Sequence, residues 1–306
     1  MPTSPEDTIL CDEWKRCYGQ PWRGVVVEEA LAHPAKFSRK LIGKVCLHAL
    51  KQGWIDAGDW VLDPFAGVAL GAYHLLPRGI NWVGVEVEEK FVEAGTANLV
   101  LWTLKFSRCS FSWGDSVLLL GDSRNLRALL EKEGLNIRPR LVISSPPYEQ
   151  AQSTGGGIAR ALVEGTDYPV PRAGRFQGYL ARDQGSSEGQ LARLKGSEFW
   201  KAVGEVLAEV KAVLRPGGHC IWILRDYVRD GKKVPFADTW RSLAEEKGFQ
   251  TLHIHRALLR EHLADQLTID GEAIPVGREY KSFFRRIQER RGAPRIDWEV
   301  VLCQRV

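Results

Sequence analysis

Long hydrophobic runs are missing from this sequence. No stretch of about 18 apolar residues occurs in it, so we expect no membrane-spanning helix. Its first residues have neither the basic start nor the apolar core of a secretory signal. The cysteines form no C-x-x-C pair, which argues against structural zinc and favours a reducing compartment. We therefore expect a cytoplasmic protein without a metal site. The six cysteines are at positions 11, 17, 46, 109, 220 and 303.

A strong net charge is also missing. The formal charge of the 306 residues is only +4, which is too small to indicate a nucleic-acid partner by itself. Its distribution is more informative, because seven basic residues but only two acidic ones, Glu279 and Glu289, occur from Arg278 to Arg295. The length and the 44% hydrophobic content suffice for one large domain. We expect a single domain over 1–306.

Short apolar stretches alternate with longer segments of helical spacing along most of the chain. Such alternation predicts a parallel sheet that is covered by helices on both faces. We expect strands at 60–62, 82–85, 117–120, 141–144, 220–224, 251–259 and 298–304, and helices at 67–76, 88–104, 124–133, 197–214 and 236–247. The segments 149–196 and 260–297 interrupt the alternation. We expect them to be inserts, since long irregular segments in a compact domain are usually functional or mobile.

Three expected strands end in an acidic residue: Asp63, Glu86 and Asp122. Ligands of an open α/β sheet bind outside the carboxyl ends of its strands. A carboxylate after the second strand suits a ribose diol, and Asp122 can accept a hydrogen bond from an adenine amine. Gly67 lets the backbone pass close to a ligand. A single acid here would more often cap a helix, but three in succession favour a nucleotide-like cofactor.

The fourth expected strand is followed directly by Ser145-Pro146-Pro147-Tyr148. The two prolines lack an N–H and have a fixed φ, so they form a stiff exit from the sheet. They hold one hydroxyl and one aromatic ring beside backbone carbonyls. A planar group with an exocyclic amine fits such a site, because the ring can stack on the plane while the hydroxyl and a carbonyl accept the amine hydrogens. Ser145, Pro146, Pro147 and Tyr148 are therefore the candidate catalytic residues.

Together these motifs resemble those of the S-adenosylmethionine-dependent, amino-methylating DNA methyltransferases. Residues 63–67 resemble the first motif of that family, Glu86 its ribose-binding acid, and 121–124 its adenine-side motif. Residues 145–148 match its catalytic motif, and 33–37 resemble its segment beside the methionine end of the cofactor. The resemblance implies a class I, Rossmann-like fold with a mostly parallel seven-stranded sheet, and S-adenosylmethionine as cofactor. The cofactor-binding residues that it implies are Lys36, Phe37, Asp63, Pro64, Phe65, Ala66, Gly67, Glu86, Asp122 and Ser123.

The serine of the catalytic motif indicates which methylated base the resemblance implies. In this family the Ser form of the catalytic motif is associated mostly with N4-cytosine, and the Asp and Asn forms mostly with N6-adenine. We therefore expect methylation of the exocyclic amine of a flipped base, with cytosine N4 favoured over adenine N6. One departure occurs in the first motif, where Ala69 replaces a second glycine. A Cβ is tolerated at this position if φ is negative.

The two inserts are the candidate DNA-recognition elements. We assign the basic segment of the second insert to phosphate contact and arginines of the first insert to base reading. The candidate DNA-binding residues are Arg172, Arg175 and Arg182 in the first insert and Arg285, Arg286, Arg290 and Arg291 in the second. DNA is the expected partner, and a cognate restriction nuclease is a candidate second partner. A solvated helix face explains the basic segment equally well.

Three other functions stay open. An RNA methyltransferase that acts on a base amine usually carries Asp before Pro-Pro-Tyr, and a protein glutamine methyltransferase carries Asn. A nucleic-acid-binding module that has lost its cofactor is supported only by Ala69. The acids at the three strand ends argue against that module.

Overall fold

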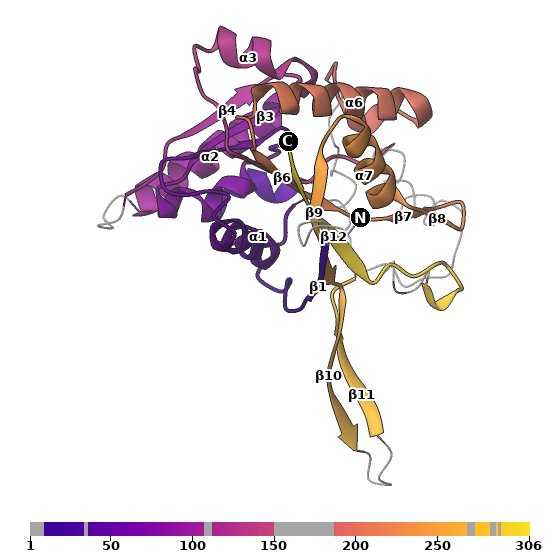
Figure 1. Ribbon diagram of the computed structural model, residues 1–306. Helices are drawn as coiled ribbons and strands as arrows, with labels where there is room; N and C mark the ends of the chain where they lie inside the picture. The colour runs from indigo at the N-terminus through magenta and orange to yellow at the C-terminus, as the bar shows by residue number, and fades with distance from the viewer. Residues whose placement is uncertain are drawn as a thin grey trace, which may run out of the picture.

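The computed structural model describes residues 9–33, 36–106, 112–149, 187–267, 273–281, 286 and 289–306, and for 261–267 and 273–276 it describes the backbone alone. An eight-stranded sheet forms its centre, in the order β1-β9-β12-β6-β5-β2-β3-β4 (Figure 1). β12 is antiparallel to β6 and β9, and the other neighbouring pairs are parallel. The strands of this sheet are β1 Leu10–Trp14, β2 Trp60–Asp63, β3 Asn81–Glu86, β4 Ser116–Leu120, β5 Leu141–Ser144, β6 His219–Leu224, β9 Gln250–Leu258 and β12 Trp298–Arg305. The prediction of a mostly parallel, class I methyltransferase-like sheet is confirmed, with β1 as an additional edge strand.

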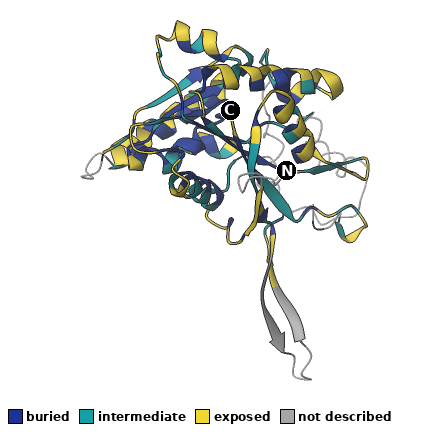
Figure 2. Ribbon diagram, in the orientation of Figure 1, coloured by how far each residue is buried: buried dark blue, intermediate teal, exposed yellow. Residues whose placement is uncertain are grey.

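Helices cover both faces of the sheet (Figure 1). Because the side chains of a strand alternate between its faces, Ile221 and Ile223 of β6 join the core under α1 and α2, whereas Trp222 joins the core under α3, α6 and α7. Each fully buried large apolar side chain contributes about 1.5–3 kcal/mol, and Figure 2 shows such residues in dark blue along the strands. The helices are α1 Arg39–Lys51, α2 Glu89–Phe106, α3 Leu126–Lys132, α6 Gly196–Val213 and α7 Phe236–Glu246. Within the described ranges, every helix is too short or too polar to span a bilayer.

The strand order reverses between β2 and β5. From β2 the chain continues outward through β3 to β4, and it then returns to place β5 on the other side of β2. A switch of this kind leaves a crevice at the carboxyl ends of the two strands, where ligands of doubly wound sheets bind. The residues that end these strands are Asp63 and Ser144.

One predicted helix, at 67–76, is wrong, whereas the other predicted elements lie within two residues of their observed bounds. The segment forms two short 3₁₀ helices, η3 Leu70–His74 and η4 Leu76–Arg78. The cause is the backbone of Ala69, which has φ +64° and ψ +22°, a left-handed conformation that interrupts an α-helix. The condition for tolerating a Cβ at position 69, a negative φ, is therefore not met. Alanine here occupies a conformation that glycine adopts without penalty.

Two hairpins extend from the carboxyl edge of the sheet. β7 Tyr227–Arg229 and β8 Lys232–Val234 follow β6, whereas β10 Arg260–Leu267 and β11 Ala273–Glu279 follow β9. The second hairpin projects away from the body of the molecule (Figure 1). Because β9 is parallel to the central strands, this hairpin leaves the sheet at the same edge as the crevice between β2 and β5.

Candidate active site

A cavity of about 260 Å³ lies at the carboxyl ends of β2, β3, β4 and β5. The residues that directly follow these strands line it, together with the segment before α1 and residues 189–191. The predicted residues that line it are Lys36, Phe37, Pro64, Phe65, Ala66, Gly67, Glu86, Asp122, Ser123, Ser145, Pro146, Pro147 and Tyr148. The structure thus places residues of the predicted cofactor group and of the predicted catalytic group in one cavity.

Glu86 ends β3 and holds the loop after β2 in place. Its Oε2 accepts the backbone N–H of Gly67 at 2.9 Å, and its Oε1 accepts those of Val87 and Glu88 at 3.0 Å each. Burial raises the pKa of this carboxyl, although the three hydrogen bonds act in the opposite direction. Each carboxylate oxygen has two lone pairs, so three of the four are used and Oε2 of Glu86 can accept one further hydrogen bond from a ligand in the cavity.

Gly67 allows the backbone to pass directly beside His33. Its φ is +50°, and a Cβ there would lie 3.0 Å from Nε2 of His33. The His33 ring is buried and packs edge-on against Phe91, with ring centroids 4.3 Å apart. Lys36 Nζ donates to the carbonyls of Leu31, at 2.9 Å, and His33. The segment before α1 therefore forms a wall of the cavity against the loop after β2.

Asp63 does not line the cavity, which corrects its expected role as a cofactor ligand. Its Oδ1 accepts the hydroxyl of Ser144 at 2.5 Å and the N–H of Phe65 at 3.1 Å. Its Oδ2 is buried and has no hydrogen-bond partner among the described residues. Burial raises the pKa of Asp63 to about 7. This side chain joins the ends of β2 and β5 beneath the cavity.

Asp122 and Ser123 follow β4 and are both held by neighbouring groups. Asp122 caps η5 Ser123–Asn125 by accepting the N–H of Arg124 at 2.9 Å. The Arg124 guanidinium also pairs with this carboxylate, with Nη2 at 2.5 Å from Oδ2. Ser123 Oγ donates to the carbonyl of Pro64 at 2.5 Å. Asp122 therefore has a fixed orientation in the cavity wall, and Ser123 joins the loops after β4 and β2.

Residues 189–191 close the cavity beside Asp122, and the sequence did not indicate them. Gly189 has φ +92°, and a Cβ there would lie 2.6 Å from Asp122 Oδ2. The buried Glu88 anchors this segment by accepting the N–H and the hydroxyl of Ser187 at 3.0 and 2.9 Å. Gln190 Nε2 donates to the same carboxylate at 3.2 Å. The end of the first expected insert is thus part of the site.

The two prolines after β5 place Ser145 and Tyr148 in the cavity wall. Ser145 is half-buried. Tyr148 packs edge-on against Phe236 of α7 and Tyr227 of β7, with ring centroids 5.0 and 5.8 Å away. Burial raises the pKa of Tyr148 to about 12, so its hydroxyl stays protonated at neutral pH. The stiff exit expected from the sequence therefore presents a hydroxyl and a ring to the same space.

Glu149 anchors the chain directly after Tyr148. Its Oε1 accepts the N–H of Gly196 at 2.6 Å and lies 3.1 Å from Nη1 of Arg229. Its Oε2 accepts the hydroxyl of Tyr227 at 3.2 Å. Burial alone would raise the pKa of Glu149, but these hydrogen bonds and Arg229 lower it. Glu149 thus fixes the start of the first expected insert to α6 and to the β7–β8 hairpin.

Arg225 and Glu299 complete the cavity beside Tyr148, and sequence reasoning missed both. Arg225 follows β6, and Glu299 lies next to it because Val300 pairs with Leu224 in the antiparallel β12–β6 pair. Arg225 Nη1 is 3.4 Å from Glu299 Oε1, and Tyr18 donates its hydroxyl to Glu299 Oε2 at 2.8 Å. Burial alone would lower the pKa of Arg225, but Glu299 raises it. No local motif signals this pair, since only strand pairing brings it together.

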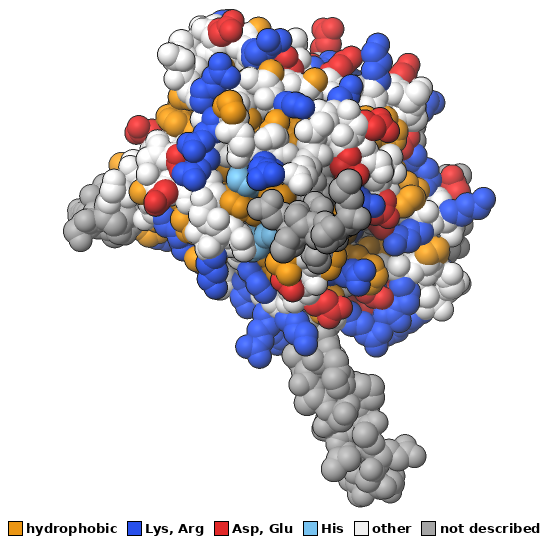
Figure 3. All heavy atoms as spheres, viewed as in Figure 1, with side chains coloured by type: hydrophobic (Ala, Val, Ile, Leu, Met, Phe, Trp, Pro, Cys, Tyr) orange, Lys and Arg blue, Asp and Glu red, His pale blue; other side chains and the backbone are white. Residues whose placement is uncertain are grey.

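The expected DNA-contact residues are described in part. Arg172, Arg175, Arg182 and Arg285 lie outside the described residues. Arg286 is half-buried, whereas Arg290 and Arg291 are exposed. Figure 3 shows Lys and Arg side chains on the surface on both sides of the base of the β10–β11 hairpin.

One member of the basic segment is already paired inside the protein. Lys281 is buried, and its Nζ lies 2.7 Å from the carboxylates of both Glu289 and Asp297. A third carboxylate, that of Glu279, lies 3.7 Å away. The segment therefore offers less uncompensated charge than its count of basic residues indicates.

No family model matches this sequence, and no curated protein matches it. Solved structures resemble it in general fold. TrmN from Thermus thermophilus has 13% sequence identity and a TM-score of 0.43, with 90% of this chain and 51% of that chain covered. This chain therefore spans about half the length of TrmN. A putative rRNA methylase from Clostridium thermocellum has 12% identity and a TM-score of 0.42, with 86% and 97% covered.

A third similar structure is the magnesium protoporphyrin IX methyltransferase of Synechocystis PCC 6803 with bound SAH. It has 9% identity and a TM-score of 0.43, with 87% of this chain and 82% of that chain covered. At such values the likeness concerns the fold alone and carries no argument about activity. The activity must be argued from the cavity itself.

Proposed function

We propose that this chain transfers a methyl group from S-adenosylmethionine to the exocyclic amine of a base in DNA, with cytosine N4 as the acceptor. One observation carries the proposal: Gly67, Glu86 and Asp122 share a single cavity with Ser145 and Tyr148. A carboxylate that suits a ribose and a hydroxyl that suits an amine in one cavity allow two ligands to be aligned for direct transfer.

The described residues fit S-adenosylmethionine. Glu86 can accept from a ribose diol, and Asp122 is fixed by Arg124 in the wall where an adenine amine can donate to it. Phe37 and Phe65 give the cavity apolar surface. The bound cofactor would supply an electrophilic methyl group on a positively charged sulfonium, and the carboxylates of the cavity would favour binding of that positive charge.

Ser145 and Pro146 are assigned to the acceptor amine. The nitrogen of such an amine is a poor nucleophile because its lone pair is delocalised into the ring of the base. If Ser145 Oγ and the carbonyl of Pro146 accept the two amine hydrogens, they pull the nitrogen toward a tetrahedral geometry with an available lone pair. Attack by the nitrogen on the methyl group would then be a direct displacement, in which the N–C bond forms as the S–C bond breaks and the neutral thioether leaves. The methylated nitrogen would afterwards lose one of its protons to solvent. Alignment and exclusion of water during the transfer favour this displacement.

Tyr148, Arg225 and Glu299 are assigned to the rest of the base. Tyr148 offers a ring for stacking, a contact worth about 1–3 kcal/mol per base. The forked guanidinium of Arg225 can donate to two acceptors at once. Cytosine presents N3 and O2 as adjacent acceptors on one side of its N4 amine, whereas adenine presents N1 on one side of its N6 amine and N7 on the other. This difference supports cytosine as the acceptor base.

The projecting β10–β11 hairpin supports duplex DNA as the substrate. The major groove of B-DNA admits a two-stranded ribbon, and the hairpin leaves the sheet at the edge that holds the cavity. Exposed basic residues stand close to its base, including Lys15 and Arg16 after β1 and Arg260 at the start of β10. The base must leave the stack to reach Ser145, and contacts of this kind can hold the duplex meanwhile.

The test combines cofactor binding with identification of the product. Purified protein is incubated with labelled S-adenosylmethionine and genomic DNA, and the digested DNA is analysed by mass spectrometry. We expect N4-methylcytosine. Glu86→Gln should weaken cofactor binding about tenfold or more, because a charge-assisted hydrogen bond contributes about 1.5–3 kcal/mol. Glu89→Gln, at the exposed start of α2, is the matched control and should leave binding unchanged.

Ser145→Ala separates catalysis from cofactor binding. It should lower the transfer rate strongly while S-adenosylmethionine affinity stays unchanged, because its partner is the base. If N6-methyladenine is the sole product, the acceptor base is adenine and not cytosine. If RNA is labelled and DNA is not, the substrate is RNA. Absence of S-adenosylmethionine binding in calorimetry would refute the methyltransferase assignment and favour a nucleic-acid-binding module.

A further inference from the structure

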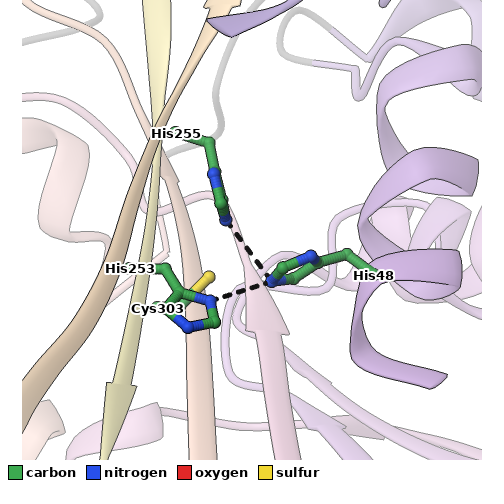
Figure 4. Close-up of side chains that lie close together, drawn as sticks. All are labelled: His48, His253, His255 and Cys303. Atoms are coloured by element: carbon green, nitrogen blue, oxygen red, sulfur yellow. Dashed lines mark hydrogen bonds between the residues drawn. The ribbon is translucent and has the colours of Figure 1, made fainter. Parts of the chain in front are cut away.

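A compact group of nitrogen and sulfur ligands lies on the α1 face of the sheet, outside the lining of the active-site cavity (Figure 4). The side chains come from α1, β9 and β12, and their possible ligand atoms all lie within 4.8 Å of one another. We call them the histidine–cysteine cluster, which consists of His48, His253, His255 and Cys303.

Regular strand geometry brings this cluster together. His253 and His255 are two residues apart on β9, so both side chains point to the same face of the sheet. Cys303 on β12 is the direct neighbour of His253 in the antiparallel ladder. The last turn of α1, which packs on this face, supplies His48. Figure 4 shows the three rings pointing toward one another, with the sulfur of Cys303 beside them.

The spacing of the ring nitrogens is that of ligands around one metal ion. Nε2 of His48 lies 3.2 Å from Nδ1 of His253 and 3.4 Å from Nε2 of His255. Zn²⁺ binds imidazole at about 2.0–2.1 Å in a tetrahedral arrangement, which places two ligand nitrogens about 3.3–3.4 Å apart. The observed separations agree with this value.

Hydrogen bonding alone gives a poorer account of these contacts. A neutral imidazole nitrogen either donates one hydrogen or accepts through one lone pair in the ring plane. Nε2 of His48 faces nitrogens of two other rings, so it can make only one of the two contacts as a well-formed hydrogen bond. A shared cation satisfies all three nitrogens at once.

We propose that the histidine–cysteine cluster is a structural Zn²⁺ site with three imidazole ligands and one thiolate ligand. Four protein ligands with nitrogen and sulfur donors give the closed tetrahedral coordination typical of structural zinc. A second layer of contacts is also present. Asp12 Oδ2 lies 3.6 Å from Nδ1 of His255, on the side of the ring away from the cluster, which is within ion-pair distance but longer than a hydrogen bond. The ring of Trp14 stacks on His255 with centroids 4.6 Å apart.

The proposal departs from the expectation that the chain has no metal site. That expectation relied on the absence of C-x-x-C, but here one cysteine and three histidines come from three elements that lie far apart in the sequence. The only local signal of a metal site in the sequence is the spacing of His253 and His255, which are two positions apart. Such a pair also occurs in strands without a metal, so the sequence alone could not distinguish the two cases.

The position of the cluster indicates what the metal would do. It would tie the last turn of α1 to β9 and β12, and through His255 to the edge strand β1. His48 is nine residues beyond Arg39, the first residue of α1, which is about 14 Å along the helix axis. The residues just before Arg39 line the active-site cavity. The metal therefore stabilises a wall of the cavity from a distance and takes no part in the reaction.

Elemental analysis of the purified protein is the first test. The full chain should be produced without a histidine tag, and it should contain about one zinc ion per molecule. Cys303→Ser and His253→Ala should each reduce zinc to less than about a tenth of that amount. Two matched controls lie on the neighbouring strand β6: Cys220→Ser removes a buried thiol from the opposite face of the sheet, and His219→Ala removes a histidine outside the cluster. Both should retain zinc.

Titration of the metal-free wild-type chain is the second test, and it does not depend on the folding of any variant. Co²⁺ should produce the visible absorption of a four-coordinate site and a thiolate charge-transfer band, both saturating near one equivalent and lost when Zn²⁺ is added. Zn²⁺ should raise the unfolding midpoint and release the thiol proton of Cys303. No zinc after purification, combined with no cobalt spectrum and no change in the midpoint, would show a hydrogen-bonded histidine cluster and overturn the proposal. These readouts involve no methyl transfer, so they stand apart from the proposed function.

Discussion

Replacement of Asp63 by asparagine should change how the stability of this protein depends on pH. Asp63 is fully buried, and within the described part of the chain only its Oδ1 is hydrogen bonded, by Ser144 and by the N–H of Phe65. Asparagine has nearly the same shape and can keep both hydrogen bonds through its carbonyl oxygen. It differs in having no charge to bury. The substitution therefore isolates the free energy of ionising this side chain inside the protein.

The sign follows from the pKa, which burial raises from 3.8 to about 7. Between these two pH values the unfolded chain has released the proton that the folded protein still holds. The stability contribution of Asp63 is therefore fully present below pH 3.8 and is lost as the pH rises toward 7. The difference between the two pKa values corresponds to about 4 kcal/mol. Relative to wild type, Asp63→Asn should gain up to that amount between pH 4 and pH 7 and gain nothing further above it.

Urea unfolding at a series of pH values, followed by circular dichroism, measures this difference directly. Asp59→Asn is a suitable control, because Asp59 lies just before the same strand but pairs with Arg140 at 2.9 Å in a partly exposed position. It makes the same chemical change, from a carboxyl to an amide, at a side chain that is ion-paired and not fully buried. A difference between Asp63→Asn and wild type that stays constant within about 1 kcal/mol across this range would refute the reasoning.

Three further predictions concern the cavity, the backbone and DNA contact. Tyr148→Ala should weaken DNA binding by about 1–3 kcal/mol while S-adenosylmethionine affinity is unchanged; equal DNA affinity in a binding assay would exclude a stacking role. Ala69→Gly should change stability in urea unfolding by less than about 1 kcal/mol, because relief of the left-handed strain of about 1–2 kcal/mol is offset by the loss of a buried methyl worth about 0.8 kcal/mol and by the larger backbone entropy of glycine in the unfolded chain, about 0.4–1 kcal/mol; a loss of more than about 1 kcal/mol would show that Ala69 is unstrained. Arg290→Ala/Arg291→Ala should lower the slope of log affinity for DNA against log salt by about two, and the exposed Lys132→Ala on α3 should not; an unchanged slope would place the two arginines away from DNA.

The central strands could be predicted because their signals are local. β5 has its predicted bounds, since four buried residues are followed, after Ser145, by two prolines that cannot continue a ladder. The acidic and hydroxyl residues after the strands could be placed together for the same reason, because parallel strands present their carboxyl ends at one edge. The edge strand β1 was not predicted because four of its five residues are exposed and show no apolar alternation. Helix α1, in contrast, has apolar residues at helical spacing, so this local signal was sufficient to predict it, although it is absent from the predicted helices.

Other features depend on pairing between distant parts of the chain. Arg225 and Glu299 meet only because β12 runs antiparallel to β6, and the histidine–cysteine cluster needs α1 to pack on β9. The burial of Asp63 could not be predicted from the sequence either. An acidic residue at the end of a strand can point into the ligand cavity or into the protein beneath the cavity. Hydrophobic periodicity reports which face of an element is buried, but it does not report which polar residues from separate elements meet.

The anchors at Glu149 and Glu88 have a consequence for how proteins of this kind can diverge. Glu149 holds the chain directly after Tyr148 to Gly196 and Arg229, and Glu88 holds Ser187 just before the cavity-lining Gly189. The contacts that hold the two anchors come from α6, the β7–β8 hairpin and Glu88. Residues 149 and 187 are therefore both fixed at the rim of the same cavity. A change of sequence between them need not alter how the described residues around Ser145 are held, so the two anchors separate the framework of the cavity from the interval that they enclose.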